Sequence, residues 1–402
     1  MKAIIEKSIA NGTILAPPSK SYAHRLLICA GLANGTSEID GIIKSEDMLA
    51  TLDCLSTLGV LHTLKNDKAT IHGSYKIYEN QVLRYQCRQS GSTLRFFIPI
   101  ALLSGGVCEF YGSERLLSRG LDVYFDICKR QNIKYEIYKD KIVFEGKLKP
   151  DTFNVRGDIS SQFITGLLFA LPLLKEDSII NITTKLESAK YIDITIDALK
   201  AFGIEITRNE GSFYIKGNQQ YKCTNASVEA DASNSAFLDA FNYIGGSVCV
   251  KGLNKNTYQP DGIYGELFEK IANGTPTIDI SNCPDLGPIL FALAGVKNGA
   301  KFTGTSRLKI KESDRAGAMA SELKKLNIAL DVYENEVIVH KSEPKRPTEI
   351  LSSHDDHRIV MASSVILSLF GGTIDGCEAV TKSYPNFFDD IRALGIRCEV
   401  IE

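Results

Sequence analysis

The segment Lys309–Arg315 carries side chains that can bind an anion and move a proton. It holds three cations, two carboxylates and the hydroxyl of Ser313, directly ahead of a strongly helical run from Ala316 to Leu326. We expect Ser313 to be the N-cap of that helix. Lys311 and Arg315, four residues apart, then project to one side of a helix start whose N–H groups attract negative charge. The segment indicates either an anion site with a proton donor or acceptor, or an ordinary solvated helix start.

Six further polar clusters open apolar helical runs elsewhere in the chain. They are Ser19–Ser21, Ser90–Thr93, Ser160–Gln162, Ala232–Ser235, Pro284–Gly287 and Asp355–Arg358. Capping alone explains their serines and aspartates. It does not explain the cations in or beside the openings and in the loops between them, which are Lys20, Arg25, Arg95, Arg358, Arg119 and Lys382. So many cations near helix starts predict ligands that carry several negative charges.

Asp285 and Glu312 are the candidate proton-transfer residues. Asp285 begins a helical run, where it suits capping as well as catalysis, and Glu312 lies between two cations, where it suits a plain ion pair as well. His354 and His357 have two carboxylates between them, but they lie only three apart in an expected loop, and no second cluster supplies further ligands. A structural histidine is therefore favoured over a metal ligand, and we expect no metal and no cofactor.

The composition excludes several classes of protein. The chain has 402 residues, enough for about two domains, and its formal net charge of −2 gives no basic field for nucleic acid or an anionic membrane. The longest apolar run, Phe163–Leu174, is too short to span a membrane. Ten scattered cysteines without a C-x-x-C pair fit a reducing compartment, so we expect a cytoplasmic protein. The phosphate-binding motifs of ATP and NAD sites are absent from the sequence.

The apolar runs recur along the chain with a supersecondary period. Each ends at a glycine-containing or polar turn, and the terminal glycines lie at intervals of about seventy residues. Between them lie amphipathic runs that lead into hairpins, such as Ile196–Phe202 before the strands Ile204–Thr207 and Ser212–Lys216. Each unit is thus predicted to be strand, buried helix, strand, amphipathic helix and hairpin. One interval is shorter, because only Thr275–Ile280 follow Asn273-Gly274 before the next cluster, so one hairpin is expected to be missing.

Six such units divide naturally into two similar α/β lobes of three units each. We expect residues 19–228 to form one lobe and residues 1–18 with 229–402 to form the other. Leu15–Pro18 looks like a stiff crossover, which assigns the first strand to the C-terminal half. A cleft between two such lobes is the natural place for the active site.

The polar clusters together resemble the EPSP synthase family, the 3-phosphoshikimate 1-carboxyvinyltransferases. The matching residues are Ala16–Ser21 with Arg25, Ser90–Ser92 with Arg95, Ser160–Gln162, Pro284-Asp285, Lys311–Arg315, Asp356–Arg358 and Lys382. They follow the family's order along the whole chain. The resemblance implies an inside-out α/β barrel fold, with two lobes of three βαβαββ units and buried parallel helices.

By this resemblance the chain transfers the enolpyruvyl group of phosphoenolpyruvate to the 5-hydroxyl of 3-phosphoshikimate and releases phosphate. The family pattern assigns to 3-phosphoshikimate the residues Lys20, Ser21, Arg25, Ser160, Ser161, Gln162, Ser188, Asp285, Arg307 and Lys311. It assigns to phosphoenolpyruvate Lys20, Gly91, Arg119, Gln162, Arg315, Arg358 and Lys382. Asp285 would take the hydroxyl proton, Glu312 would protonate the methylene carbon, and Lys20 would assist both substrates. The family also suggests a monomer.

Three residues depart from the family pattern, and two other functions stay open. Gln89 stands where asparagine is frequent, Phe96 where proline is frequent, and Arg307 where asparagine is frequent. UDP-N-acetylglucosamine enolpyruvyl transferase has the same fold and donor, but it uses a cysteine in the loop that here is Ser113–Arg119, outside which Cys108 and Cys128 lie. A non-catalytic anion-binding protein on the same scaffold is the other alternative.

Overall fold

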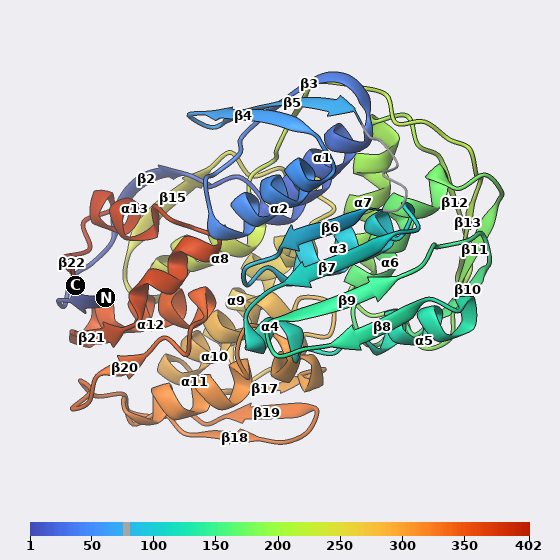
Figure 1. The fold of residues 1–402 in the computed structure, drawn as a ribbon. Coiled ribbons are helices and arrows are strands. Elements are labelled where there is room, and N and C mark those ends of the chain that lie inside the picture. The colour runs from blue at the N-terminus through green and yellow to red at the C-terminus, as the bar shows by residue number, and fades with distance from the viewer. Residues whose placement is uncertain (75–80) are drawn as a thin grey trace. The chain divides into compact units, whose positions relative to one another are not determined.

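The computed structural model describes residues 1–74 and 81–402 and divides into two compact units (Figure 1). The first unit is Met1–Ser19 with Glu229–Glu402, and the second unit is Lys20–Val228. Both are mixed α/β structures. In the part of the chain that is described, every helix is too short or too polar to cross a membrane.

The described part of the second unit contains three four-stranded sheets of one topology. Their strand orders are β14-β3-β5-β4, β6-β7-β9-β8 and β10-β11-β13-β12. In each sheet the first two strands are parallel and the last two form an antiparallel hairpin. The strands are β3 (Asn34–Asp40), β4 (Leu61–Lys65), β5 (Lys68–Ser74), β6 (Val82–Gln86), β7 (Val107–Tyr111), β8 (Lys134–Ile137), β9 (Lys141–Glu145), β10 (Thr152–Val155), β11 (Ser178–Ile182), β12 (Ile206–Asn209), β13 (Ser212–Ile215) and β14 (Ala226–Ser227).

Among the described residues of the second unit, three helices are buried almost all round, and the longer of the remaining helices are amphipathic. The buried helices are α1 (Lys20–Leu32), α3 (Gly91–Ala101) and α6 (Ser161–Ala170). Their rings meet in a chain, because His24 packs edge-on to Phe96 and Phe96 packs edge-on to Phe169. The other helices are α2 (Glu46–Thr57), α4 (Glu114–Leu117), α5 (Asp122–Gln131), α7 (Ala189–Ala201) and the 3-10 helix η1 (Leu171–Leu173).

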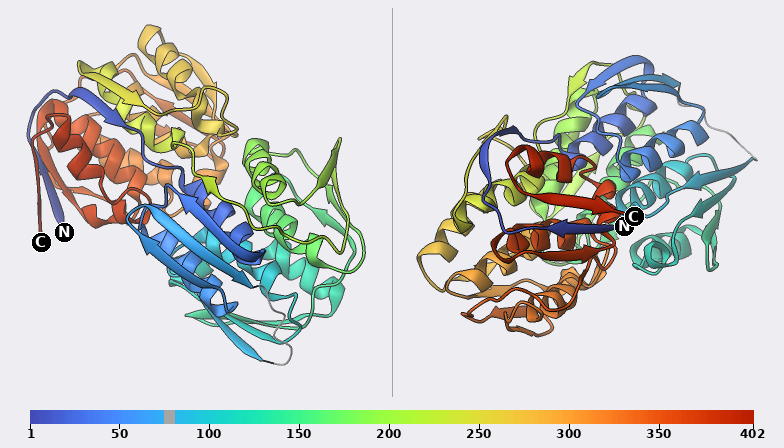
Figure 2. Two further views of the ribbon diagram at one scale, coloured as in Figure 1. Left: turned by 90° about the horizontal axis from the view of Figure 1, so that it is seen from above. Right: turned by 90° about the vertical axis from the view of Figure 1, so that its left-hand side faces the viewer.

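The described part of the first unit also has three sheets, but one of them is shortened to two strands. Its sheets are β20-β21-β1-β22, β16-β17-β19-β18 and the two-stranded β15-β2. The strands are β1 (Lys2–Ile5), β2 (Asn11–Leu15), β15 (Ser247–Lys251), β16 (Thr277–Asp279), β17 (Ala300–Thr303), β18 (Leu330–Val332), β19 (Glu336–Val339), β20 (Leu351–Ser352), β21 (Gly372–Asp375) and β22 (Cys398–Ile401). The N-terminal strand β1 pairs antiparallel with both β21 and β22, so the two chain ends lie side by side (Figure 2).

The helices of the first unit follow the same division. The buried helices are α8 (Ala232–Asp239), α10 (Gly287–Val296) and α12 (His357–Phe370), and the amphipathic ones are α9 (Tyr264–Asn273), α11 (Arg315–Lys324) and α13 (Phe387–Ala393). Short 3-10 helices are η2 (Ala240–Ile244), η3 (Pro260–Ile263), η4 (Pro284–Leu286), η5 (Ser306–Ile310) and η6 (Cys377–Lys382). Helix α9 leads directly into β16, which confirms the predicted absence of one hairpin.

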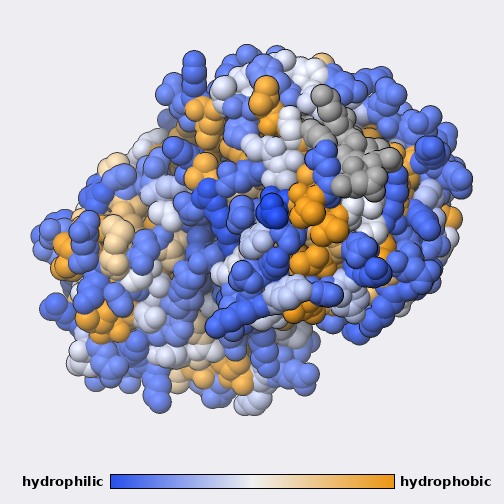
Figure 3. Space-filling view, in the orientation of Figure 1, coloured by the Kyte–Doolittle hydropathy of each residue, from blue (hydrophilic) through white to orange (hydrophobic). Residues whose placement is uncertain are grey.

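Each unit has its own apolar core, built from its buried helices and the inward faces of its sheets. The face of the molecule shown in Figure 3 is mostly hydrophilic, with apolar side chains in scattered patches. Every one of the sheets is open, with two edge strands, so the described strands close no β-barrel. The buried helices form the interior of each unit.

All six predicted helix openings are confirmed. At four of them the N-cap side chain accepts a backbone N–H, and these N-caps are Ser90, Ser160, Asp231 and Asp356.

Candidate active site

Asp285 lies at the centre of a cluster of cations in the first unit. Its Oδ1 accepts a hydrogen bond from Arg315 Nη1 at 2.7 Å and lies 3.2 Å from Lys311 Nζ. Its Oδ2 accepts from Arg358 Nη2 at 3.0 Å. The side chain sits in the 3-10 turn η4 ahead of α10 and is 19% exposed, so a ligand can reach it. The predicted position of Lys311 and Arg315 on one side of their segment is confirmed by this shared oxygen.

Arg315 is the most deeply buried of the three cations and joins three carboxylates. Its side chain is 1% exposed. Besides Asp285, it donates from Nη2 to Glu312 Oε2 at 2.6 Å and from Nε to Asp356 Oδ2 at 2.8 Å. Asp356 is fully buried and also accepts the backbone N–H of Arg358 at 2.9 Å. Arg315 therefore fixes the positions of both predicted proton-transfer residues, Asp285 and Glu312.

The expected cap of α11 is wrong by one residue. The N-cap is Asp314, whose Oδ1 accepts from Gly317 N at 3.3 Å, and the helix runs from Arg315 to Lys324 rather than from Ala316 to Leu326. Ser313 instead donates its hydroxyl to Asp356 Oδ2 at 3.0 Å. The Ser313 hydroxyl thus bonds to a carboxylate 43 positions further along the chain, whereas the local sequence predicted that it would cap the helix.

The cations set the charge states of the cluster. Burial alone would raise the pKa of Asp285, but Arg358, Lys311 and Arg315 outweigh it and hold that pKa well below its ordinary value. Burial lowers the pKa of Lys311, against the opposing pull of Asp285. Although burial disfavours its charge, the carboxylates of Asp356, Glu312 and Asp285 raise the pKa of Arg315. Asp285 is thus a carboxylate that these cations must partly release before it can accept a proton.

Arg358 keeps donors available for an anion. It is 4% exposed, and its Nε and Nη1 are buried without a hydrogen-bond partner among residues 1–74 and 81–402. Buried donors of this kind are costly unless a ligand satisfies them. Lys382, predicted to bind the same ligand, contacts Asp355, with Nζ 2.6 Å from Oδ1. Arg307 donates to the carbonyl of Ser281 at 3.3 Å.

In the second unit, the starts of α3 and α6 are joined around Arg95. Arg95 Nη1 donates to Gln162 Oε1 at 2.9 Å, and Gln162 Nε2 donates to Ser92 Oγ at 3.0 Å. Arg95 Nη2 donates to the carbonyl of Arg119 at 3.0 Å. A Cβ on Gly91 would lie only 2.7 Å from Arg119 Nη1. The structure thus brings Gly91, Arg119 and Gln162 together, with Arg95 as the link.

Within the second unit, the residues predicted to bind 3-phosphoshikimate lie near the starts of α1, α6 and α7. Arg25 donates to Ser21 O at 2.6 Å, to Tyr191 O at 3.1 Å and to Thr195 Oγ1 at 2.8 Å. Burial lowers its pKa to about 10. Ser188 has a left-handed φ of +55° and precedes α7. Its carbonyl oxygen accepts a hydrogen bond from Tyr191 N at 3.1 Å. Ser160 caps α6 and Ser161 is its buried first residue.

Two carboxylates, one in each unit, that interact with predicted site residues were missed from the sequence. Asp47 Oδ2 accepts from Lys20 Nζ at 2.9 Å, and its only local signal is a place in the first turn of α2. Asp261 is buried in η3 and interacts electrostatically with Asp285 and Arg358. Neither residue belongs to a cation-rich opening, which is why the sequence pattern passed over them.

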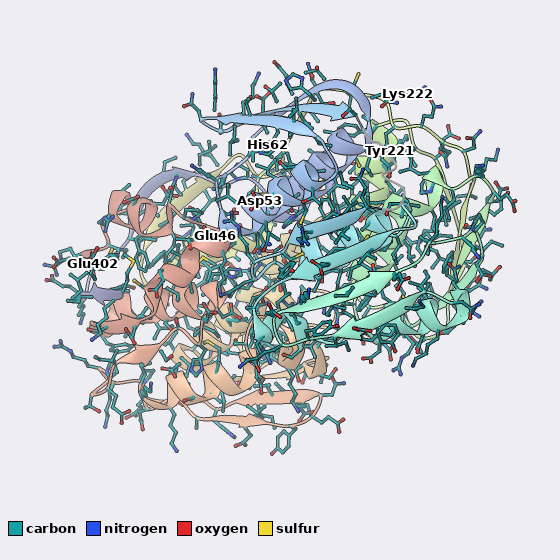
Figure 4. The ribbon with its side chains drawn as sticks, viewed as in Figure 1. Glu46, Asp53, His62, Tyr221, Lys222 and Glu402 are labelled. Atoms are coloured by element: carbon teal, nitrogen blue, oxygen red, sulfur yellow. The ribbon has the colours of Figure 1, made fainter. Side chains whose placement is uncertain are left out.

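The loop before α3 is held in place by a second arginine. Arg88 has a left-handed φ of +51° and donates to Glu46 Oε2 at 2.6 Å and to Asp53 Oδ2 at 2.8 Å. Figure 4 labels these two carboxylates on α2. Arg88 fixes the chain immediately ahead of Gln89 and the N-cap Ser90. Phe96, the second departure from the family pattern, is buried beneath the guanidinium of Arg25.

The histidines show no arrangement for a metal. Among the residues that the structure describes, no three His, Cys, Asp or Glu side chains are placed to hold an ion. His354 Nε2 lies 2.7 Å from Glu322 Oε1, and His357 is buried at the start of α12. His24 contacts Thr51 Oγ1 through Nδ1 at 2.7 Å, and its pKa lies well below the ordinary value because of burial and the neighbouring Lys20 and Arg25.

The fold is that of the enolpyruvyl transferases. A solved EPSP synthase from Acinetobacter baumannii superposes with a TM-score of 0.79 over all of both chains, at 21% identity. The enolpyruvyl transferase NikO from Streptomyces tendae superposes with a TM-score of 0.80, at 12% identity, and covers 99% of this chain and 98% of that one. At these identities the likeness concerns the fold alone.

Sequence comparison narrows the class to one family. The family model described as EPSP synthase (3-phosphoshikimate 1-carboxyvinyltransferase) matches residues 6–391. A 3-phosphoshikimate 1-carboxyvinyltransferase from Clostridium kluyveri is 42% identical, covering 96% of this chain and 95% of that one. Another from Clostridioides difficile is 40% identical and covers 98% of each. The chain belongs to the EPSP synthase family.

Proposed function

We propose that this protein transfers the enolpyruvyl group of phosphoenolpyruvate to the 5-hydroxyl of 3-phosphoshikimate, releasing phosphate. The observation that carries the proposal is the cluster around Asp285, where three cations converge on one ligand-accessible carboxylate. Both substrates carry a phosphate and a carboxylate, which these cations suit. Membership of the EPSP synthase family supports the same reaction, a step of aromatic amino acid biosynthesis by the shikimate pathway.

The proposed binding residues are those of the family pattern. For 3-phosphoshikimate they are Lys20, Ser21, Arg25, Ser160, Ser161, Gln162, Ser188, Asp285, Arg307 and Lys311. For phosphoenolpyruvate they are Lys20, Gly91, Arg119, Gln162, Arg315, Arg358 and Lys382. Arg315 donates to three carboxylates already, so it mainly supplies charge, whereas Arg358 supplies unsatisfied N–H groups. We propose that the clusters of the two units serve the same reaction, because neither contains the whole set.

Anion binding would activate Asp285 as a base. With its present partners the carboxylate has a pKa far below that of an effective general base at neutral pH. A substrate anion would compete for Arg358 and Lys311, and the loss of their attraction would raise the pKa of Asp285. The base would therefore gain strength only when the substrates are bound, which limits unproductive proton transfer to water.

The reaction then proceeds by addition and elimination. Asp285 takes the 5-hydroxyl proton as the oxygen bonds to C2 of phosphoenolpyruvate. Glu312, after taking up a proton from solvent, gives it to C3, and a tetrahedral intermediate forms. The C2–O bond to phosphate then breaks, and C3 returns a proton to the protein as the double bond re-forms. Lys20 and the arginines stabilise the negative charge on both substrates and on the departing phosphate. No redox change occurs, and the proposal includes no cofactor or metal.

We also propose a monomer that acts in the cytoplasm on small-molecule substrates, without nucleic acid or a membrane as partner. The net charge of −2 and the scattered cysteines support this view. The alternative reaction on UDP-N-acetylglucosamine is disfavoured, because the loop in which that enzyme uses a cysteine contains no cysteine in this chain. Cys108 and Cys128 are buried outside the loop Ser113–Arg119, and burial raises their pKa values to about 11 and about 12.

Phosphate release from phosphoenolpyruvate tests the choice of acceptor. We expect rapid release with 3-phosphoshikimate and only background release with UDP-N-acetylglucosamine or without an acceptor. Release that depends on UDP-N-acetylglucosamine would establish the alternative enzyme. Binding of both anions without release under any condition would establish a non-catalytic protein instead.

Gly91→Ala tests the proposed phosphoenolpyruvate residues. The new Cβ would lie 2.7 Å from Arg119 Nη1 and 3.1 Å from Arg95 Nη1, so the flexible end of Arg119 must move. Losing a charged hydrogen bond to the substrate costs about 1.5–3 kcal/mol, so we expect KM for phosphoenolpyruvate to rise about tenfold or more, with a smaller change in kcat. Gly265→Ala in α9 is the control, because a Cβ there meets nothing within 4 Å. An unchanged KM in Gly91→Ala would remove Arg119 from the proposed site.

A further inference from the structure

A row of four buried polar side chains joins helices α1, α2 and α3 in the second unit. His24 Nδ1 lies 2.7 Å from Thr51 Oγ1, which in turn lies 2.9 Å from Thr93 Oγ1. Thr93 Oγ1 then donates to Ser90 Oγ at 2.8 Å. Each of these four side chains is at most 1% exposed. They form a continuous hydrogen-bond relay, which ends at the N-cap of α3 directly before Gly91.

The N-cap of α3 fixes the direction of the relay. Ser90 Oγ accepts the backbone N–H of Thr93 at 3.2 Å as well as the Thr93 hydroxyl. A hydroxyl group has a single proton to donate, so the Thr93 hydroxyl, which donates to Ser90, must accept from Thr51. By the same count the Thr51 hydroxyl has no proton left for His24. The ring nitrogen Nδ1 of His24 must therefore carry a proton and donate it to Thr51.

The surroundings of His24 agree with a neutral ring that is protonated on Nδ1. Burial and the neighbouring charges of Lys20 and Arg25 lower its pKa well below the ordinary value. Its Nε2 is buried without a hydrogen-bond partner among residues 1–74 and 81–402. With the proton on Nδ1, Nε2 is an acceptor, so the ring buries no unpaired N–H group.

The two ends of the relay differ in how firmly they are held. Helix α1 is anchored separately to α7, because Arg25 donates to Tyr191 O at 3.1 Å and to Thr195 Oγ1 at 2.8 Å. At the other end, Ser90 lies outside α3, directly before its first residue, and its hydroxyl oxygen is held by Thr93. Breaking the relay should therefore disturb the start of α3 more than the start of α1.

We propose that His24 and Thr51 are positioning residues that hold the N-cap of α3, and with it Gly91, in the place that the donor anion requires. His24 does this as a neutral ring with its proton on Nδ1. The inference rests on the proposed function, because it takes Gly91 as a residue of the phosphoenolpyruvate site. Neither positioning residue contacts a substrate in that proposal.

Thr51→Val tests the positioning role, because it interrupts the relay by replacing a hydroxyl with a methyl group of similar size. We expect the KM for phosphoenolpyruvate to rise about threefold to tenfold, the effect of one lost hydrogen bond, while kcat and the KM for 3-phosphoshikimate change less than about twofold. Thr51→Ser keeps the hydroxyl and should keep the wild-type KM. Ser104→Ala is the matched control, since it removes a buried hydroxyl beyond the other end of α3, where Ser104 donates to Ala101 O at 2.8 Å.

Stability measurements distinguish positioning from a purely structural contact. A Thr51→Val protein that loses stability in denaturant unfolding but keeps the wild-type KM for phosphoenolpyruvate would overturn the proposal. An equal rise of KM for both substrates would overturn it as well. If Thr51→Val does not fold, Thr93→Val interrupts the same relay one residue nearer the cap, and the same outcomes decide the question.

The ¹⁵N magnetic resonance of the histidine rings in the unliganded protein separates this inference from the proposed function. In wild type, His24 should carry its proton on Nδ1 alone, whereas Thr51→Val should show both tautomers, because Nδ1 has lost its acceptor. His24→Asn identifies the signals by their absence. This result would stand even if no turnover of phosphoenolpyruvate were found. A proton on Nε2 in wild type would reverse the relay and contradict the proposal.

Discussion

Asp285→Asn should lower kcat by about 10²–10⁴-fold while the protein continues to bind 3-phosphoshikimate. The amide cannot accept the 5-hydroxyl proton, which is the role proposed for the carboxylate. Binding should persist or tighten, because Arg315, Lys311 and Arg358 lose a competing anion. Phosphate-release rates give kcat, and isothermal titration calorimetry gives the dissociation constant of 3-phosphoshikimate.

Asp314→Asn is the matched control for this substitution. Asp314 is exposed and caps α11, a role that asparagine performs about equally well, so kcat should stay within about twofold of wild type. If Asp285→Asn also kept its kcat within that range, Asp285 would not be the base. A variant that lost both turnover and binding would instead show that the carboxylate organises the cations.

Arg315→Met should produce the largest loss of stability. The side chain is 1% exposed and joins Asp285, Glu312 and Asp356, so its removal leaves three carboxylates without their shared cation. Breaking a buried ion pair by deleting one partner typically costs about 3–5 kcal/mol in the free energy of unfolding. Denaturant unfolding followed by circular dichroism measures the loss, and hydrogen exchange locates it at α11 and α12.

The pH dependence of this loss has a definite sign. Because the pKa of Asp285 is held below its ordinary 3.8, its ion pairs stabilise the folded protein at neutral pH, and that contribution disappears as pH falls toward the depressed pKa. The difference between wild type and Arg315→Met should therefore narrow in acid. Arg315→Lys, which keeps the charge without the planar fork, should fall between them. Exposed Arg346→Met is the control, and an equal effect of both methionine variants would contradict the role of Arg315.

The local signals in the sequence were sufficient to predict the helix openings. Capping depends on residues within one turn, so Ser90, Ser160 and Asp356 could be placed at helix starts without tertiary information. The failure at Ser313 has the opposite cause. Its hydroxyl bonds to Asp356, far along the chain, and that contact outweighed the local preference.

The partners of the charged residues could not be predicted in the same way. Lys382 contacts Asp355, and Lys20 contacts Asp47, through contacts that only the folded chain creates. Asp261 follows Gln259-Pro260, which resembles an ordinary turn, and the sequence gives no sign that its side chain is buried and bonded to Ser233. Sequence patterns thus pointed to the cations proposed to bind the substrates, whereas the carboxylate partners Asp47 and Asp355 were identified only from the structure.

The central claim, enolpyruvyl transfer by addition and elimination, is tested most directly by nuclear magnetic resonance of the complete reaction in D2O. The ³¹P spectrum should show inorganic phosphate forming in step with the loss of both phosphoenolpyruvate and 3-phosphoshikimate. Because C3 passes through a methyl group, the ¹H spectrum should show a vinyl ether product with deuterium in its methylene. Release of phosphate with pyruvate as the co-product and 3-phosphoshikimate unconsumed would contradict the account.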